Sequence, residues 1–229
     1  MEMFCSLKQC TLYSEVNIVL KTVVRGIELT FETANDLFSP RSIDCGTLAL
    51  LSTIEFDELD KVCDLGCGYG AIGIIAAKIM GSENVLMIDN NSLAVEVARK
   101  NVVLNGVPNI EVVLSNGFSN IQEKDFSKII THPPYHVDFA VPKAFIEKGF
   151  NRLKINGAFY MVTKRKTWYE KKLTAIFGNV EISMIDGYYI FKAIKRHENY
   201  AKVNHKKAKV KTPSRKKGGG AKYASRNGD

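Results

Sequence analysis

The chain has 229 residues, of which 45% are hydrophobic and 10% aromatic, enough for the core of one α/β domain with appendages. No apolar stretch approaches the roughly 20 residues that a membrane helix needs, and the first ten residues lack a secretory signal pattern. The five cysteines show no C-x-x-C spacing, which argues against a zinc or disulfide framework. We therefore expect a cytoplasmic protein with reduced thiols, no membrane contact and no bound metal.

The net charge of +8 is concentrated at one end of the chain. Residues 195–229 carry 12 Lys and Arg against 2 Asp and Glu, so the other 194 residues carry 20 basic and 22 acidic groups. The segment has few apolar residues, and we expect a disordered basic tail. Its cations could neutralise RNA phosphates, and a merely solvated tail is the alternative. The candidate RNA-binding residues of the tail are Lys206, Lys207, Lys216 and Lys217.

Residues 1–50 are expected to form a unit that precedes the main domain of residues 51–194. Val16–Val24 and Ile27–Glu32 are β-rich runs joined across Arg25-Gly26, which is typical of a hairpin. Further along, the apolar run Leu48–Leu51 predicts a short lead-in helix. We expect the hairpin and this helix to pack on the main domain.

The main domain alternates strand and helix patterns. We expect strands at Lys61–Leu65, Asn84–Asp89, Ile110–Leu114, Ser127–Thr131 and Ala158–Thr163, with helical patterns between them. The helix after the second of these strands should be capped by Ser92. Val180–Ile185 and Tyr188–Ile194 flank Asp186-Gly187 and predict an antiparallel hairpin. The sequence thus predicts an α/β fold with a mostly parallel seven-stranded sheet, covered by helices on both faces and ending in an antiparallel strand.

The strongest local motif is the glycine-rich segment that follows the first of these strands, Asp64-Leu65-Gly66-Cys67-Gly68-Tyr69-Gly70. Glycine lets the backbone approach a ligand closely, and this turn lies where open α/β sheets bind ligands. Residues 68–73 also satisfy G-x-G-x-x-G, so the glycines alone leave NAD and S-adenosylmethionine open. The Asp64 carboxylate favours the second cofactor, because it suits an ammonium group and would repel a pyrophosphate.

Two polar side chains follow the next strand ends. Asp89 can accept hydrogen bonds from the ribose hydroxyls of either cofactor, and Asn116 could bind an adenine edge. A dehydrogenase would also need a substrate domain, for which no chain remains. The cofactor is therefore expected to be S-adenosylmethionine.

The segment Thr131-His132-Pro133-Pro134-Tyr135-His136 follows the fourth strand. Prolines fix the backbone, and their carbonyls can accept a hydrogen bond from a substrate amine. Tyr135 offers a flat face for stacking a base that has been extracted from its stack. A simple proline turn is the alternative interpretation.

A basic run follows the fifth strand at the same edge of the sheet. Lys164, Arg165 and Lys166 could grip the phosphates that flank a target nucleotide, or they could form a solvated turn.

Together these motifs resemble the small-domain class of Rossmann-like S-adenosylmethionine-dependent methyltransferases, which includes ribosomal RNA guanine-N2 methyltransferases. The shared features are D-x-G-x-G-x-G, the acidic end of the second strand and the Pro-Pro-Tyr-His motif. Phe38-Ser39 followed by Asp44-x-Gly46-Thr47 matches a further segment of that class. The resemblance spans roughly residues 15–195.

The resemblance implies a role for each matching residue. The methionine part of the cofactor would be bordered by Asp64, Gly66, Gly68 and Gly70, the ribose would be held by Asp89, the adenine would lie near Asn116, and the site would be closed by Ser39 and Thr47. Pro133 and Tyr135 would position the acceptor amine. The implied activity is N-methylation of an exocyclic base amine, guanine N2 in ribosomal RNA, with adenine N6 or a protein glutamine amide as alternative acceptors.

One position departs from the pattern, because the asparagine of the family is His132 here. A neutral imidazole can accept a hydrogen bond from the target amine, whereas a protonated one cannot. We therefore expect transfer to decline as the pH falls through the pKa of His132, which is near ~6.5 when unperturbed. A non-catalytic RNA-binding or ribosome-assembly factor that kept the fold is the alternative.

Overall fold

The computed structural model describes residues 18–133 and 139–201. In these ranges the strands are β1 (Ile18–Val24), β2 (Ile27–Thr33), β3 (Val62–Leu65), β4 (Val85–Asp89), β5 (Glu111–Leu114), β6 (Phe126–Thr131), β7 (Leu153–Thr163), β8 (Glu181–Ile185) and β9 (Tyr188–Ile194). The helices are α1 (Cys45–Ser52), α2 (Ala71–Met80), α3 (Ser92–Leu104), α4 (Ala140–Arg152) and α5 (Thr167–Phe177).

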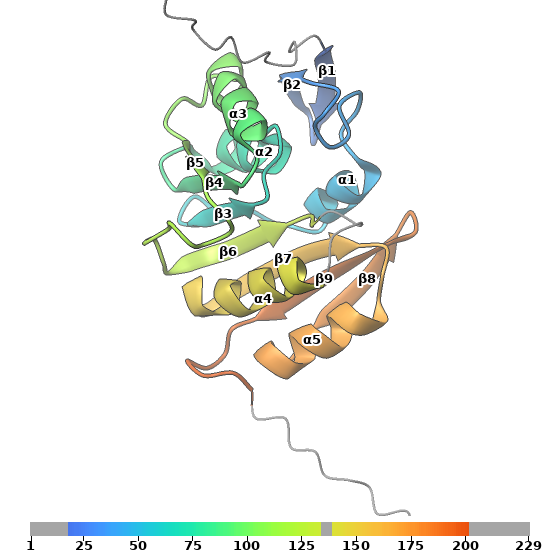
Figure 1. Ribbon diagram of the computed structural model, residues 1–229, viewed down its shortest axis with the longest axis vertical. Coiled ribbons are helices and arrows are strands. Elements are labelled where there is room, and N and C mark those ends of the chain that lie inside the picture. The colour runs from blue at the N-terminus through green and yellow to red at the C-terminus, as the bar shows by residue number, and fades with distance from the viewer. Residues whose placement is uncertain (1–17, 134–138, 202–229) are drawn as a thin grey trace, which may run out of the picture.

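The main sheet has seven strands in the order β5-β4-β3-β6-β7-β9-β8 (Figure 1). The strands β5, β4, β3, β6 and β7 pair in parallel, whereas β9 is antiparallel to both β7 and β8. Asp186 and Gly187 join β8 to β9, both with positive φ, as a two-residue hairpin turn requires. This arrangement confirms the Rossmann-like α/β fold with an antiparallel C-terminal strand.

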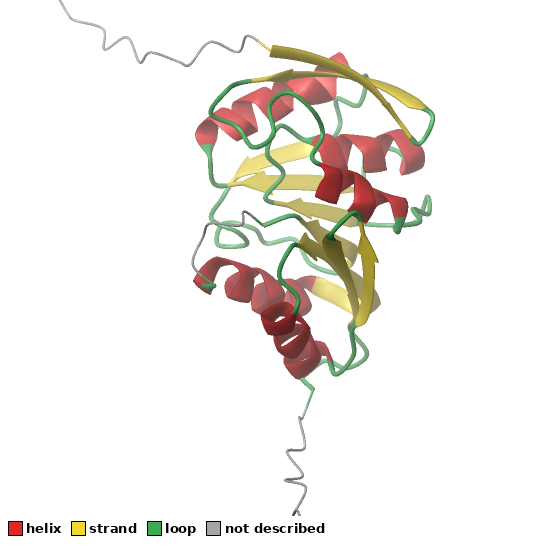
Figure 2. Cartoon of the chain, turned by 90° about the vertical axis from the view of Figure 1, so that its right-hand side faces the viewer, coloured by secondary structure: helices red, strands yellow, loops and turns green. Residues whose placement is uncertain are grey.

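Alternate residues of the central strands face two different helical layers. In β3, Val62 packs in the core that includes α1, α2 and α3, while Cys63 and Leu65 pack in the core that includes α4 and α5. All three side chains are completely buried. Burial on both faces explains why β3 and β4 consist mostly of apolar residues. Figure 2 shows the sheet between the two layers.

Two asparagine side chains attach the β1–β2 hairpin to α3. Asn101 Oδ1 accepts a hydrogen bond from Glu32 N at 2.7 Å, and its Nδ2 donates to Glu32 O at 2.9 Å. Asn105, one helical turn later, makes the same pair of bonds with Thr30 at 3.1 and 2.8 Å. The two amides therefore bind alternate residues along the outer edge of β2, as a neighbouring strand would.

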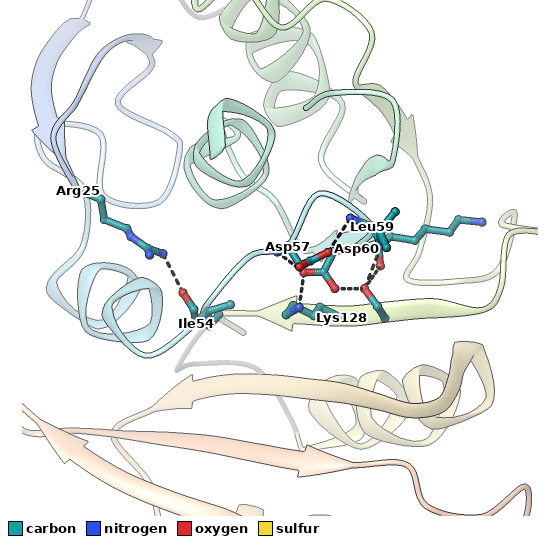
Figure 3. A network of polar contacts seen from close by, with 8 residues as sticks. Arg25, Ile54, Asp57, Leu59, Asp60 and Lys128 are labelled. Carbon is teal, nitrogen blue, oxygen red and sulfur yellow. Dashed lines mark hydrogen bonds and ion pairs between the residues drawn. The ribbon is translucent and has the colours of Figure 1, made fainter. Parts of the chain in front are cut away.

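A buried ion pair joins β6 to the loop before β3, at the end of the sheet where β3 begins (Figure 3). Lys128 pairs with Asp60, whose carboxylate also accepts hydrogen bonds from Ser127 Oγ at 2.7 Å and Asp57 N at 2.8 Å. Burial raises the pKa of Asp60, but the bonds from Lys128, Asp57 and Ser127 outweigh burial and leave the pKa below its usual value. This network lies at the end of β3 away from the glycine loop.

Two local features differ from the expectations drawn from the sequence. The cap of α3 is Asn91, whose side chain accepts from Leu93 N at 2.9 Å, and Ser92 is the first helical residue. Residues 115–125, between β5 and β6, form a loop, whereas a helix was expected there.

Residues 195–201 pack on the domain, so the prediction that a disordered tail begins at residue 195 is wrong for these residues. The Lys195 side chain is 6% exposed, and its Nζ lies 5.2 Å from the centre of the Phe150 ring. The Tyr200 ring packs edge-on against Phe150 at 5.0 Å between centroids, and its hydroxyl donates to Glu147 O at 3.2 Å. The predicted tail beyond residue 201 lies outside the described residues, as do residues 1–17 of the predicted N-terminal unit.

Across residues 18–133 and 139–201, no helix has the length and apolar character required to span a membrane.

Candidate functional site

A cavity of about 330 Å³ opens at the carboxyl ends of β3, β4, β5 and β6. Its volume lies at the lower end of the roughly 300–1,000 Å³ range of small-molecule sites. The glycine loop between β3 and α2 contributes to the lining, together with the residues after β4 and β5, the segment before α1 and part of α4. Parallel α/β sheets hold their ligands at this edge.

The glycine loop keeps side chains away from one wall of the cavity. Gly66, Gly68 and Gly70 have φ angles of +80°, +57° and +100°, in the region that favours glycine. A Cβ on Gly68 would meet no atom within 4 Å, so open space lies beside the backbone. Gly66 and Gly68 line the cavity, whereas Gly70 caps α2 outside the lining, where a Cβ would come within 3.0 Å of Met87 Cε.

Asp89 ends β4 and lines the cavity beside this loop. Its Oδ2 accepts a hydrogen bond from Gly68 N at 2.8 Å, and its Oδ1 accepts from Asn91 N at 2.9 Å. An ionised carboxylate has about four acceptor positions, so both oxygens can accept a further bond. Asn116 follows β5 and lines the same cavity. The predicted ribose-binding and adenine-binding side chains therefore lie in one site.

Asp64 is completely buried and does not line the cavity. Its Oδ2 accepts from Gly73 N at 2.8 Å, and its Oδ1 has no hydrogen-bond partner among the described residues. Burial raises the pKa of Asp64 to about 7, the bond from Gly73 opposes this shift, and the charge of Asp89 adds to it. A cation bound near the glycine loop would stabilise the ionised form of this carboxyl.

Apolar side chains form part of the cavity wall. The Phe145 ring of α4 lies 3.7 Å from the position of a Cβ on Gly66 and 3.4 Å from that of a Cβ on Gly117. Val141 of the same helix and Phe38 of the segment before α1 are also part of the lining, with exposed fractions of 37% and 47%. Apolar walls with a few placed polar groups are typical of sites for planar organic ligands.

The segment before α1 and α1 itself each contribute one predicted residue. Ser39 lines the cavity with a φ of +49°, and its hydroxyl donates to Ser42 O at 2.7 Å. Thr47 is buried and also lines the cavity. The structure therefore brings both residues to the site.

His132 follows β6 and connects it to this segment. Its Nδ1 lies 2.9 Å from Thr47 Oγ1 and 3.6 Å from Asp44 Oδ1. Asp44 caps α1 by accepting from Gly46 N at 2.8 Å, and its other oxygen accepts from the Tyr188 hydroxyl at 3.3 Å. A Cβ on Gly46 would come within 2.5 Å of the Tyr188 ring, so this close approach requires glycine.

Burial lowers the pKa of His132 to about 4, and the neighbouring Asp44 carboxylate opposes this shift only in part. The imidazole is therefore neutral at physiological pH and retains one nitrogen that can accept a hydrogen bond. The acidic decline expected near pH ~6.5 consequently moves toward pH 4.

The other predicted substrate-binding residues are not part of the cavity lining. Pro133 is buried next to His132. Lys164, Arg165 and Lys166 are exposed between β7 and α5. Tyr135 and the tail residues Lys206, Lys207, Lys216 and Lys217 lie outside the described residues.

Several side chains of the lining were not predicted from the sequence, among them Asp44, Phe38, Val141 and Phe145. Asp44 and Phe38 belong to a motif that matched the family, so that motif was the available signal for them. Val141 and Phe145 carry no signal beyond an ordinary helical pattern, because their position beside the glycine loop depends on how α4 packs on the sheet. Within the described ranges, no three His, Cys, Asp or Glu side chains are grouped so as to hold a metal ion.

Comparison with known proteins relates this site to a family. The model of the family "Methyltransferase small domain" matches residues 28–192. The chain is 33% identical over 178 residues to the Bacillus subtilis protein "Uncharacterized protein YbxB", which covers 75% of this chain and 89% of that protein. It is 31% identical over 172 residues to "Ribosomal RNA small subunit methyltransferase C" of Cronobacter sakazakii, which covers 73% of this chain and 50% of that protein.

Among solved structures, the chain is similar to the 16S rRNA N2 methyltransferase RsmC of T. thermophilus, which was solved in complex with AdoMet and guanosine. The TM-score is 0.72 with 26% identity, covering 78% of this chain and 50% of that one. The chain thus spans about half the length of the two ribosomal RNA methyltransferases that it matches. It belongs to the methyltransferase small domain family, the S-adenosylmethionine-dependent methyltransferases of Rossmann-like fold.

Proposed function

We propose that this chain transfers a methyl group from S-adenosylmethionine to the exocyclic N2 amine of a guanine in ribosomal RNA. The observation that carries the proposal is the cavity itself, which joins a glycine loop and Asp89 to a neutral His132 within one lining. Two ribosomal RNA methyltransferases, 31% and 26% identical to this chain, support the choice of substrate.

The residues of the cavity fit the cofactor. Gly66 and Gly68 would border its methionine part, Asp89 would accept hydrogen bonds from the ribose hydroxyls, and Asn116 would meet the adenine edge. The unpartnered Oδ1 of Asp64 fits a cationic ligand near the loop, although this carboxylate lies outside the lining. When bound, S-adenosylmethionine supplies a methyl group that its sulfonium has already activated.

The protein contributes mainly position and the exclusion of water. His132, neutral by burial, would accept a hydrogen bond from the target amine and so direct the nitrogen lone pair toward the methyl group. The carbonyl of Pro133 could accept a hydrogen bond from the second N–H of the amine, and Tyr135 would stack on the base. An aromatic amine loses its proton readily once it is methylated, so no strong base is needed.

Cationic groups outside the cavity would bind the RNA backbone. Lys164, Arg165 and Lys166 follow β7 at the same edge of the sheet as the glycine loop. Phosphate contacts of this kind position a nucleic acid, whereas the site itself selects the base.

The test is methyl transfer from isotopically labelled S-adenosylmethionine to ribosomal RNA and ribosomal proteins from a strain that lacks this protein. We expect label in N2-methylguanosine at one position, identified by mass spectrometry of nuclease fragments. Label in N6-methyladenosine, or in a glutamine of a ribosomal protein, would instead establish one of the alternative acceptors.

The histidine at position 132 also motivates a second candidate function, that of an RNA-binding or assembly factor without transferase activity. An inactive wild type that binds RNA and becomes active as His132→Asn would favour this candidate. Activity of the wild type would exclude it.

A further inference from the structure

We propose that Asp44 and Thr47 are positioning residues that hold His132 in its Nδ1–H tautomer, so that Nε2 carries the lone pair that meets the target amine. The inference rests on the proposed function for the identity of that amine. The tautomer itself is a property of the protein and can be measured without any substrate.

The chemistry of the replaced residue makes such a device necessary. An asparagine side chain always offers its oxygen as an acceptor. A neutral imidazole has two tautomers, and its Nε2 is an acceptor in only one of them. A histidine at this position therefore needs neighbours that select the tautomer.

Both neighbours lie at the same ring nitrogen. Thr47 Oγ1 is 2.9 Å from Nδ1, within hydrogen-bond distance, and Asp44 Oδ1 is 3.6 Å away. A carboxylate repels a lone pair and attracts an N–H, so Asp44 favours a proton on Nδ1. The threonine hydroxyl can donate or accept, and it accepts once Nδ1 carries the proton.

The carboxylate is held in this orientation by bonds of its own. Gly46 N donates to Asp44 Oδ1 at 2.8 Å, and the Tyr188 hydroxyl donates to Oδ2 at 3.3 Å. The side chains of His132 and Asp44 are only 5% and 17% exposed, so water screens their interaction weakly. A cation also lies beside Tyr188: Lys164 Nζ is 4.8 Å from the centre of the Tyr188 ring, and Lys164 belongs to the segment after β7.

The arrangement also serves the proton that the reaction releases. As the new C–N bond forms and the C–S bond breaks, the amine nitrogen acquires a positive charge and becomes strongly acidic. Nε2 can take this proton, Asp44 then faces an imidazolium rather than a neutral ring, and solvent receives the proton after the product leaves. The pairing of a carboxylate with the far nitrogen of a catalytic imidazole follows the same logic as in serine hydrolases.

The test is nitrogen NMR of the full chain labelled with ¹⁵N-histidine. The signals of His132 are identified by their loss in His132→Asn, since the chain has four histidines. Near neutral pH we expect Nδ1 at the chemical shift of a protonated nitrogen and Nε2 at that of an unprotonated one. The reverse pattern in the wild type overturns the proposal.

Matched variants assign the effect to the two residues. Asp44→Asn keeps an oxygen that can cap α1 but removes the charge, and Thr47→Val removes the hydroxyl at nearly constant volume. We expect Asp44→Asn to shift His132 toward the Nε2–H tautomer and to lower kcat several-fold. Thr47→Val removes the partner of Nδ1 and should also lower kcat, with a smaller change of tautomer, whereas Thr47→Ser should retain the wild-type tautomer. Unchanged tautomers in both Asp44→Asn and Thr47→Val overturn the positioning role. Circular dichroism identifies any variant that fails to fold. In that case the tautomers of the wild type and of Thr47→Ser decide.

The outcomes also separate this inference from the proposed function. An Nδ1–H tautomer in a protein that methylates no ribosomal RNA overturns the activity and leaves the positioning role standing. Methyl transfer to ribosomal RNA by a protein with the Nε2–H tautomer supports the activity and overturns the positioning role.

Discussion

His132 shows how burial changes what a single residue can do. The side chain lies at the position where the family motif that the sequence resembles has an asparagine, and burial lowers its pKa to about 4. It is therefore uncharged near neutral pH, as an asparagine would be.

This environment predicts a pH profile for methyl transfer. At saturating S-adenosylmethionine, the wild-type rate should be constant between about pH 6 and 8 and should fall only as the pH approaches 4, whereas the rate of His132→Asn should lack this fall. The folded pKa is below the unfolded value of ~6.5, so the free energy of unfolding also decreases as the pH drops from about 6.5 to 4. Rates must therefore be normalised to folded protein by circular dichroism. A wild-type decline centred near pH 6.5, or one shared with the asparagine variant, would contradict this assignment.

Asp64 has the opposite dependence on pH. Its pKa is about 7 in the folded chain and about 3.9 in the unfolded chain, so the folded state holds the proton more tightly. The free energy of unfolding should therefore fall as the pH rises from about 4 through 7. Asp64→Asn keeps an acceptor for Gly73 N without a charge, and it should be more stable than the wild type at pH 8 by about 1–3 kcal/mol. Urea unfolding at about pH 5 and pH 8 measures the difference, and parallel pH dependences in the two proteins would count against it.

At the scale of elements, the strands that are buried on both faces were predicted within about a residue. β3 and β4 are apolar except for Asp64 and the terminal Asp89, so their pattern leaves little ambiguity. β7 begins at Leu153 rather than at the predicted Ala158. Its first residues pair only irregularly with β6, so the sequence pattern of a regular strand begins later. The loop from β5 to β6 was not distinguished from a helix. Its apolar residues Phe118 and Ile121 are three positions apart, a spacing that also occurs on one face of a helix.

The residues of the predicted site also fall into two groups, those placed by local sequence and those placed by long-range packing. Gly66, Gly68 and Asp89 follow from local sequence, because a strand end and the turn after it fix where they lie. The contact of Thr47 with His132 joins positions 85 residues apart, and that of Asp44 with Tyr188 joins positions 144 apart. Such contacts depend on the packing of α1 against the sheet, which no short-range pattern encodes.

The ion pair between β6 and the loop before β3 should stabilise the far end of the sheet only while both partners are present. Lys128→Met leaves the buried Asp60 carboxylate without its cation and with only the hydrogen bonds from Ser127 and Asp57, which costs up to about 3–5 kcal/mol. The matched control is Lys192→Met, since Lys192 and Glu181 form an exposed pair at 3.4 Å whose loss costs about 1 kcal/mol or less. Urea unfolding compares the two, and equal losses would show that burial is unimportant here. The loss in Lys128→Met should shrink in acid, because protonation then removes the charge of Asp60.

For the molecule as a whole, charge separates the folded domain from the C-terminal segment. Residues 202–229 carry 10 basic groups and 1 acidic group, a net charge of +9, so the remaining residues have a net charge of 8 − 9 = −1. Because residues 195–201 pack on the domain, a truncation that removes only the C-terminal segment should end the chain after Ala201 rather than after Ile194.

Truncation after Ala201 should flatten the salt dependence of RNA binding. Each phosphate contact that the segment makes contributes to the slope of log affinity against log salt, and these contacts disappear with it. Affinity for S-adenosylmethionine should be unchanged, because the cavity residues belong to the folded domain. Fluorescence anisotropy with a ribosomal RNA fragment at several salt concentrations measures the slope. An equal slope in both proteins would mean that the segment is merely solvated.

The asparagine pair of α3 makes the hairpin a reporter on the whole domain. The amides of Thr30 and Glu32 belong to β2, but their acceptors are the side chains of Asn105, which caps the end of α3, and of Asn101 within it. Their hydrogen exchange therefore measures separation of the hairpin from the helix, independently of the pairing between β1 and β2. Asn101 Nδ2 also donates to the carbonyl of Tyr69 in the glycine loop at 2.9 Å. Two backbone amides of the N-terminal hairpin can thus register, by their exchange rates, whether the loop more than thirty residues away is held in place when cofactor binds.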